Sequence, residues 1–396
     1  MSGATIAVFA VACGLAVGNL YYAQPLLDTI GRAFGVTEAG ASLIVTVTQL
    51  GYAAGLLFIA PLGDLLENRR LIATVLGGTV IALLAAAAAP TFGAFIVASL
   101  GIGVTSVAAQ ILVPFAAHLA PAQRRGRIVG QVMSGLLMGI LLARAAAGVI
   151  SGALGWRAVY LISAGLLVLT IAVLLGTLPR RQPAFAHGYG ELVASLGRIF
   201  REQPILRRRA AYQSAMFGTF SVFWTSVTFL LAGPAFHFSQ TQIGVFALAG
   251  AAGALFAPIA GRLGDSGHER IVTGGAFLAA AAAFALTLLQ RQMWALVCGA
   301  IVLDLAVQTT LVLGQRAIYS LDPAARSRLN TLYIATFFCG GAAGSAAAGF
   351  VYAHAGWAGS VAIGAALPLA AFVLWLADLR FPAALPAGAN AGEPNG

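Results

Sequence analysis

Lysine is missing from this 396-residue chain, and charged residues of any kind make up only 9% of it. A typical soluble protein has roughly 25% charged residues, and a soluble fold of this size needs them to cover its surface. Hydrophobic residues make up 60% of the chain, and the mean hydropathy is +0.91. The composition therefore excludes a cytosolic enzyme, a nucleic-acid-binding protein and a disordered chain.

Cysteine and the common catalytic motifs are also scarce. The three cysteines, Cys13, Cys298 and Cys339, are scattered through apolar runs, so neither a disulfide framework nor a zinc site is indicated. Without lysine there is no phosphate loop of the G-x-x-x-x-G-K type, which disfavours a primary pump. The H-E-x-x-H and G-x-S-x-G motifs are absent too, so we expect no enzyme, no metal and no cofactor.

What the chain has instead is long apolar runs, each near the length of about 20 residues that a membrane-spanning helix needs. They cover residues 4–26, 40–61, 71–89, 92–117, 128–152, 158–178, 210–235, 242–261, 271–289, 293–317, 330–353 and 358–378. The first run lacks a basic start and a small-residue cleavage site, so it is not a cleaved signal peptide. The sequence predicts an all-α membrane protein with twelve transmembrane helices.

The placement of arginine supports this number of helices and their orientation. With the N-terminus inside, 18 of the 22 arginines fall in cytoplasmic segments, while Arg32, Arg157 and Arg291 fall outside and Arg144 lies within a span. Cytoplasmic loops of membrane proteins carry such an excess of positive charge. The net charge of +10 therefore marks topology. We expect a multi-pass protein of the bacterial inner membrane with both termini cytoplasmic.

One long loop divides the twelve spans into six and six. Within it, Glu191–Glu202 has apolar residues at helical spacing and arginines elsewhere on the wheel, as in an amphipathic helix on the inner membrane face. The expected organisation is a six-helix bundle, a cytoplasmic linker with the amphipathic helix, a second six-helix bundle and a flexible cytoplasmic tail. These parts cover residues 1–178, 179–209, 210–380 and 381–396.

The two halves resemble each other at an offset near 201 residues. Asp64 matches Asp265, and the Gly-Trp pair at 155–156 matches that at 356–357. A duplicated six-helix unit is typical of secondary transporters, whose binding site lies between the repeats.

Two loops at matching places resemble the signature G-x-L-a-D-r-x-G-R-R of the major facilitator superfamily. They are residues 61–70 (PLGDLLENRR) and 261–270 (GRLGDSGHER). More narrowly, residues 21–27 (YYAQPLL) and 326–330 (RSRLN) resemble bacterial efflux members related to drug:proton antiporters and sugar exporters. The resemblance covers the whole chain and implies the major facilitator fold, with two six-helix repeats.

The resemblance also implies a cytoplasmic gate. In the family, the signature aspartate faces a helix N-terminus, whose partial positive charge favours an anion. By position, Asp64 would face the start of the eleventh helix near Asn330, and Asp265 would face the start of the fifth near Arg127. The expected gate residues are Asp64, Arg69, Arg70, Asp265 and Arg270.

The chain departs from the antiporter pattern in two places. Ser99 stands where family members often carry an arginine linked to proton coupling, four residues before Gly103. In the fifth span, Gly135 and Gly139 are not followed by the usual proline, and Arg144 comes five residues after Gly139.

Two charged residues lie well inside predicted spans, where a charge is costly and marks a functional candidate. Asp304 falls near the middle of the tenth span and Arg144 in the outer half of the fifth. Burial disfavours the charged form of a carboxyl group, so Asp304 is a candidate for proton coupling. Arg144 would attract an anionic group or keep Asp304 charged, and we expect the two to interact at least through water in one state. The alternative for Asp304 is a structural partner of a neighbouring dipole or arginine.

Polar and aromatic residues inside the spans are candidates for a substrate cavity, because polar groups avoid lipid. The resemblance implies that the first, fourth, seventh and tenth helices line this cavity. The candidates are Tyr21, Tyr22, Gln24, Gln49, Gln110, Trp224, Gln308 and Phe337. Aromatic side chains among them would suit an apolar or aromatic substrate, although core packing is the common role of such residues.

The leading interpretation is a monomeric secondary active transporter that exports a small organic compound, drug-like, metabolite or sugar, by alternating access with proton coupling. Its partners would be that small molecule, protons and the lipid bilayer, with no nucleic acid. Proton-coupled uptake by symport is the main alternative. A membrane-embedded enzyme is disfavoured because no catalytic motif occurs in the spans.

Overall fold

The computed structural model describes residues 3–182, 188–250, 268–322 and 325–380. Its α-helices are α1 (Gly3–Gly18), α2 (Leu27–Phe34), α3 (Glu38–Phe58), α4 (Asn68–Ala88), α5 (Phe92–Thr105), α6 (Ala108–Leu119), α7 (Arg125–Leu154), α8 (Trp156–Thr177), α9 (Tyr189–Glu202), α10 (Pro204–Ala232), α11 (Gln240–Phe246), α14 (Glu269–Leu286), α15 (Met293–Tyr319) and α16 (Arg326–Arg380). Short 3₁₀ turns, η1 (Gln24–Leu26), η2 (Ala60–Asp64) and η3 (Ala122–Arg124), connect some of them.

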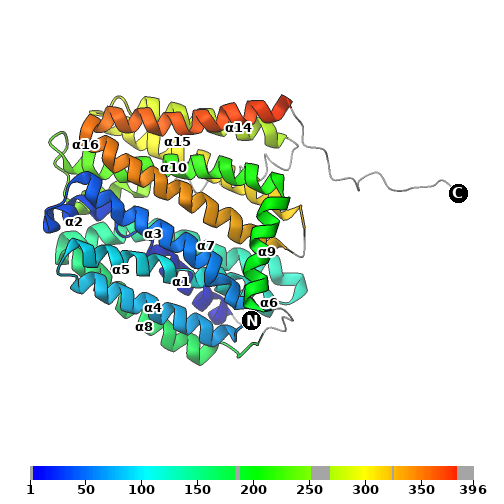
Figure 1. Ribbon diagram of the computed structural model, residues 1–396. Helices are drawn as coiled ribbons and strands as arrows, with labels where there is room; N and C mark the ends of the chain where they lie inside the picture. The colour runs from blue at the N-terminus through cyan, green and yellow to red at the C-terminus, as the bar shows by residue number, and fades with distance from the viewer. Residues whose placement is uncertain (1–2, 183–187, 251–267, 323–324, 381–396) are drawn as a thin grey trace.

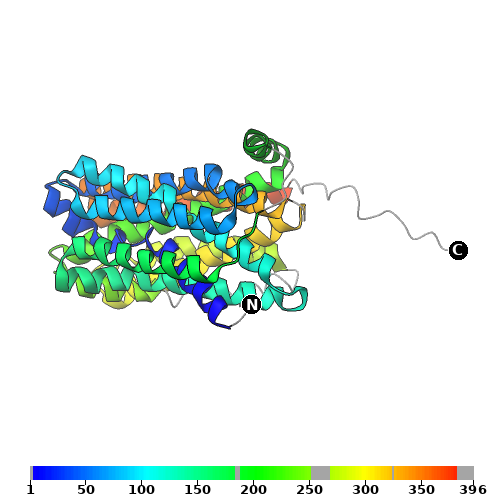
Figure 2. The ribbon, with the colours of Figure 1, turned by 90° about the horizontal axis from the view of Figure 1, so that it is seen from below.

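Most helices run side by side along one direction of the molecule, and α9 lies across one end of the bundle (Figures 1 and 2). The beginning of α1 and the end of α16 lie at this same end, called here the α9 end. Within the described residues, nine helices are long and apolar enough to cross a membrane. One of them, α16, contains two spans, because Gly356 has a φ of 58° that breaks the helix. The eighth predicted span, 242–261, passes outside the described residues after residue 250, and Asp265 lies outside them as well.

Several helices begin where a side chain satisfies free backbone N–H groups, which apolar surroundings cannot do. Thr37 accepts from the N–H of Gly40 at the start of α3, and Thr91 does the same for Ala94 at α5. Glu67 accepts from two backbone N–H groups at the start of α4. The caps of α3 and α4 account for helix starts that lie two and three residues before the predicted spans, whereas α5 begins at the predicted residue 92.

The first predicted span, 4–26, is not one continuous helix. The α-helix α1 ends at Gly18, and a tight turn leads to η1, where Pro25 has no N–H to continue an α-helix. Residues 20–27 are nevertheless all buried. The break therefore directs the side chains of Tyr21, Tyr22 and Gln24 into the protein interior.

Helix α10 is the most enclosed described element. Every residue from 216 to 231 is buried, including five serines and threonines. A helix buried on all sides lies at the centre of a bundle. Here its neighbours are α15 and α16 of its own half and the η1 segment of the other half.

Glycines bring several helices into direct backbone contact, and most of these contacts lie within one half of the chain. A Cβ atom on Gly51 of α3 would lie 2.6 Å from the carbonyl oxygen of Leu100 in α5. A Cβ atom on Gly139 of α7 would similarly overlap the backbone of Gly14 in α1, and one on Gly340 of α16 would overlap Ser214 of α10. These pairs permit close static packing.

We call α1–α8 the N-half and α10–α16 the C-half, and several contacts between the two lie at the end opposite α9. A Cβ atom on Gly148 of α7 would lie 2.6 Å from the Cα atom of Gly244 in α11. The Oγ of Ser345 in α16 donates to the carbonyl oxygen of Ser42 in α3, 3.2 Å away. The two halves therefore touch near this end through α7 with α11 and through α3 with α16.

Helix α9 covers the segment predicted to be amphipathic. Its apolar residues Leu192 and Leu196 are buried. The Oη of Tyr189 donates to the carbonyl oxygen of Phe58 at 2.8 Å, and Arg328 of α16 donates to the Oγ of Ser195 at 3.3 Å. Thus α9 packs on the helix ends of the protein and contacts both halves.

Candidate functional site

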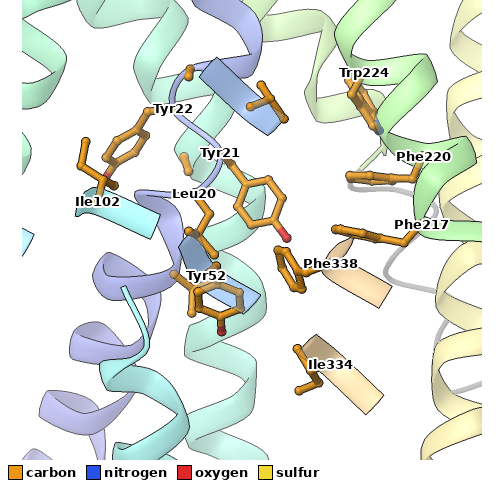
Figure 3. Packing of buried hydrophobic residues seen from close by; sticks show 14 of the residues in the cluster. Leu20, Tyr21, Tyr22, Tyr52, Ile102, Phe217, Phe220, Trp224, Ile334 and Phe338 are labelled. Atoms are coloured by element: carbon orange, nitrogen blue, oxygen red, sulfur yellow. The ribbon is translucent and has the colours of Figure 1, made fainter. Parts of the chain in front are cut away.

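Trp224 lies at the centre of a buried cluster between the two halves. On α10, Phe217, Phe220 and Trp224 are spaced by three and four residues and therefore share one helix face. Figure 3 shows these rings facing Tyr21 and Phe338 across the interior. The ring centroids of Phe220 and Trp224 are 6.3 Å apart, and those of Phe217 and Phe338 are 4.8 Å apart. The cluster is a continuous aromatic surface.

Arg144 reaches this cluster from α7 and is only 4% exposed. Its guanidinium carbon lies 4.5 Å from the ring centroid of Trp224, 5.0 Å from that of Phe220 and 5.1 Å from that of Tyr21. Aromatic faces attract a cation at such distances, and the attraction strengthens when water is excluded. The Nε of Arg144 donates to Oε1 of Gln24 at 2.8 Å. The rings and this amide replace part of the water that Arg144 has lost.

Asp304 contacts the N–H at the edge of the same indole. It is 6% exposed, and its Oδ1 accepts a hydrogen bond of 3.0 Å from Nε1 of Trp224. Arg144 and Asp304 also interact electrostatically. Trp224 thus joins the two charges: its face contacts the cation and its N–H binds the carboxylate. The interaction of Arg144 with Asp304 through water, which the sequence predicts, stays a prediction. In this structure the two side chains are connected through the indole of Trp224.

A small cavity of about 10 Å³ lies beside Arg144. This is about the space that one water molecule requires. It is lined by Gln24, Pro25, Arg144, Trp224, Val227, Thr228, Ile243, Phe246 and Ala247. Its walls therefore come from η1 and α7 of the N-half and from α10 and the α11 region of the C-half.

Direct bonds across the interface continue on both sides of the cavity. The Oγ1 of Thr228 donates to the carbonyl oxygen of Gln24 at 3.0 Å. The Nε2 of Gln49 donates to the Oγ of Ser221 at 3.1 Å. Farther toward the α9 end, the rings of Tyr52 and Phe338 are 4.6 Å apart. Gln24 and Gln49, both predicted cavity residues, thus join the halves.

The other predicted cavity residues lie apart from the charged cluster. Tyr22 points toward α8, where Ser163 Oγ donates to its Oη at 3.4 Å. Gln110 donates to the Oη of Tyr52 at 3.1 Å, and Gln308 is half-buried on α15. Phe337 is buried, with its ring centroid 5.0 Å from that of Phe217. Of the eight candidates, the structure places Tyr21, Gln24 and Trp224 directly around Arg144.

The predicted gate residues of the first signature loop lie at the α9 end. The carboxylate of Asp64 interacts electrostatically with Arg181 and with Arg328 in the first turn of α16. Arg69 donates to the carbonyl oxygen of Leu178 at 3.2 Å, within the N-half.

Two further gate candidates are exposed. Arg70 is exposed, and its Nε lies 3.7 Å from Oε2 of Glu67. Arg270 is exposed at the start of α14. Asp265, the counterpart of Asp64 in the second loop, lies outside the described residues.

Sequence reasoning missed several residues of the interface, among them Phe217, Phe220, Phe338 and Tyr52. The three-and-four spacing of Phe217, Phe220 and Trp224 is a signal that could have identified the shared face of α10. The position of Phe338 opposite Tyr52 has no such signal, because 286 residues separate them along the chain.

Comparisons with known proteins agree with this architecture. The sequence profile of the Major Facilitator Superfamily matches residues 6–303 and 215–394. The "Uncharacterized transporter YgaY" of Escherichia coli O157:H7 is 43% identical over 376 residues, which cover 95% of each chain. The "Probable transporter SCO4007" of Streptomyces coelicolor is 38% identical over 381 residues, which cover 92% of this chain and 86% of its own.

A crystal structure shares the fold. A bacterial homologue of the human lysosomal transporter Spinster, in an inward-facing and occupied conformation, matches with a TM-score of 0.76 at 16% identity. The match covers 95% of this chain and 96% of that one. The predicted fold class is confirmed, and the predicted absence of an enzymatic role agrees with the family. This chain belongs to the Major Facilitator Superfamily and is a multi-pass membrane protein of the secondary transporter class.

Proposed function

We propose that this transporter exports a small organic compound by alternating access and that Asp304 carries the coupled proton. The observation that supports the proposal is the Arg144–Trp224–Asp304 arrangement at the interface between the halves. Burying an isolated carboxylate is costly, and Asp304 is compensated by one indole N–H and by Arg144 beyond it. When Asp304 is protonated, it no longer needs the indole N–H and the charge of Arg144 to compensate its own charge. Protonation therefore changes an electrostatic attraction that spans the interface.

Alternating access requires that contacts between the halves break and reform at each end. At the end opposite α9, α7 contacts α11 through Gly148, and α3 contacts α16 through Ser42. In our proposal these contacts separate when the transporter opens to that side. In our proposal the gate at the α9 end includes Asp64, Arg69, Arg70 and Arg270; Asp265, the fifth predicted gate residue, lies outside the described residues.

We further propose that the α9 end faces the cytoplasm of a bacterial cell and that the protein works as a monomer in the inner membrane. The arginine-rich segments that begin α4, α7, α10 and α16 support this orientation. It places both termini inside, with the predicted linker of residues 179–209 between two six-helix domains, although α10 already begins within that range at Pro204.

The direction of export rests on the resemblance of residues 21–27 and 326–330 to efflux members. Proton-coupled uptake by symport is the second candidate, and one observation favours it. Arg144 carries a positive charge beside the cavity, and an anionic substrate there would bind best when Asp304 is neutral. A substrate and a proton that bind together move in the same direction.

The test first finds a substrate by growth-inhibition screening of a strain that carries the gene, against the same strain with Asp304→Asn. Substrate accumulation is then measured in inverted and right-side-out vesicles under an imposed proton gradient. Accumulation in inverted vesicles with an acidic lumen supports export by antiport. Accumulation in right-side-out vesicles with an acidic exterior supports uptake by symport. No gradient-driven accumulation in either orientation contradicts proton-coupled transport.

A further inference from the structure

Two hydrogen-bond donors beside the cavity have no partner among the described residues. They are Nη2 of Arg144 and Nε2 of Gln24. Both side chains are almost fully buried, at 4% and 1% exposed, and both line the cavity. Burying a donor without a partner is costly, above all when the donor is charged. Native structures rarely tolerate two such donors side by side unless something else binds them.

The orientation of the Gln24 amide follows from its neighbours. Its Oε1 accepts from Nε of Arg144, so the amide nitrogen must point elsewhere. The backbone of Gln24 is held in turn by Thr228, whose hydroxyl donates to the Gln24 carbonyl oxygen. Gln24 therefore has an unpaired donor, not an unpaired acceptor, at the cavity that Arg144 also lines.

We propose that these two donors bind the carboxylate of an organic acid with an aromatic or apolar body, which makes such acids the substrate class. This inference rests on the proposed proton-coupled transport, and of the two candidate directions it agrees with uptake by symport. A guanidinium and a neighbouring amide N–H match the acceptor oxygens of a carboxylate. The rest of the cavity wall includes Val227, Ile243 and Phe246, which bring no competing charge. A cationic substrate would instead meet Arg144 with repulsion.

The aromatic surface indicates the body of this acid. From Trp224 it continues over Phe220 to Phe217, whose ring is stacked on that of Phe220 at 5.2 Å, and on to Phe338 (Figure 3). Flat apolar groups pack well on such a surface. If the carboxylate of the acid binds Arg144, the ring attached to that carboxylate lies beside these side chains.

The present cavity has room for only one oxygen atom, so the site must open to admit an acid. Ile243 on the cavity wall belongs to α11, which is held against α7 at Gly148 and Gly244. Moving α11 away from α7 enlarges the cavity and opens it toward the end opposite α9. Binding is thereby tied to the contact that alternating access must break.

Asp304 couples to this site through charge. In the described residues, the charged or titratable groups that face Asp304 are Arg144 from α7 and Tyr21 from the segment before η1. A bound carboxylate adds a second negative charge near Asp304, so it binds more tightly when Asp304 is neutral. By reciprocity, the bound acid favours protonated Asp304.

The test is calorimetric titration of the purified full-length protein in lipid nanodiscs with three acids and their amides. The pairs are benzoate and benzamide, phenylacetate and phenylacetamide, and 1-naphthoate and 1-naphthamide. We expect at least one carboxylate to bind about 10-fold or more tightly than its amide. Arg144→Gln should weaken carboxylate binding by a similar factor.

Gln24→Glu is the sharper variant, because it keeps the acceptor for Arg144 and replaces the free donor with an acceptor. It should abolish carboxylate binding. Gln213→Glu is its matched control: Gln213 is also buried, but it bonds to Thr310 within the C-half. Asp304→Asn should tighten carboxylate binding by about 5-fold or more.

Several results would overturn the inference: no binding by any of the three carboxylates, equal binding of acid and amide, or unchanged binding in Gln24→Glu. If the vesicles then show Asp304-dependent, proton-driven movement of a neutral or cationic compound, the proposed function stands without this site. If carboxylates bind but no compound moves with protons in either vesicle orientation, the site stands and the proposed coupling fails.

Discussion

At the scale of single residues, Trp224 does two different things for two opposite charges. Its ring face contacts the guanidinium of Arg144, and its N–H donates to Asp304. A direct ion pair would hold both charges to each other and would be costly to separate in a membrane. Because the indole contacts each charge separately, Asp304 can take up a proton without the breaking of a direct ion pair.

Replacing Asp304 with asparagine tests its role as the proton carrier. The amide keeps the shape and can still accept from Trp224, but it cannot take up a proton. We expect Asp304→Asn to abolish accumulation driven by a proton gradient while exchange of labelled for unlabelled substrate across the membrane continues. Both are measured in the same proteoliposomes. Gradient-driven accumulation at the wild-type level would assign Asp304 a structural role instead.

Two substitutions of Trp224 separate its contributions to stability. Trp224→Phe keeps a ring over Arg144 and loses the N–H donor, which should lower the free energy of unfolding by about 1.5–3 kcal/mol. Trp224→Leu also loses the cation–ring contact and should cost a further 0.5–2 kcal/mol or so. Denaturant titration in detergent measures both. Equal stability of wild type and Trp224→Phe would show that the hydrogen bond adds nothing.

At the scale of helices, α7 uses its glycines for two purposes. Gly135 and Gly139 pack on α1 of the same half, whereas Gly148 and Gly152 pack on α11 of the other half. The first pair holds a half together, and the second forms a contact that must be broken during transport. Glycine spacing in the sequence is the same in both pairs, so only the partner helix distinguishes them.

Valine at these positions should therefore have different effects. A side chain at Gly139 would overlap Gly14, and we expect Gly139→Val to destabilise the fold by about 1–3 kcal/mol. Gly148→Val should leave the N-half folded but keep α7 and α11 apart, so that transport falls more than stability does. Thermal unfolding and transport are compared for each variant. Gly165→Val is the control, because a Cβ there meets nothing within 4 Å. A loss of stability in Gly148→Val equal to that in Gly139→Val would argue against this distinction.

At the scale of the whole molecule, the two halves meet through contacts that any change of access must rearrange. A Cβ atom on Gly152 would lie 3.6 Å from the Cβ of Thr241, which suits a disulfide bond. The pair joins α7 to α11 at the end opposite α9.

The double variant Gly152→Cys/Thr241→Cys tests whether these helices separate. In a background without Cys13, Cys298 and Cys339, oxidation should link α7 to α11 and stop transport, and a reductant should restore it. Each single cysteine variant serves as a control and should respond to neither treatment. Full transport by the oxidised, cross-linked protein would show that α7 and α11 stay together throughout the cycle.

The order of residues was sufficient to predict the helical spans, their arginine-rich end and the two charges inside the membrane. These follow from local rules: an apolar run long enough to cross a bilayer becomes a helix, and arginine stays at its cytoplasmic end. The break of the first span at Gly18 was less visible, because hydropathy does not register where the backbone turns.

Only the tertiary structure decided which of these residues meet. Gln24 bonds to Arg144 over 120 residues of chain, and Trp224 to Asp304 over 80. Such contacts depend on which faces of packed helices oppose each other, and helical spacing within one segment does not specify the neighbouring helix. For that reason the sequence marked Arg144 and Asp304 as functional candidates, while the indole that links them and the unpaired donors beside it emerged from the packing of the two halves.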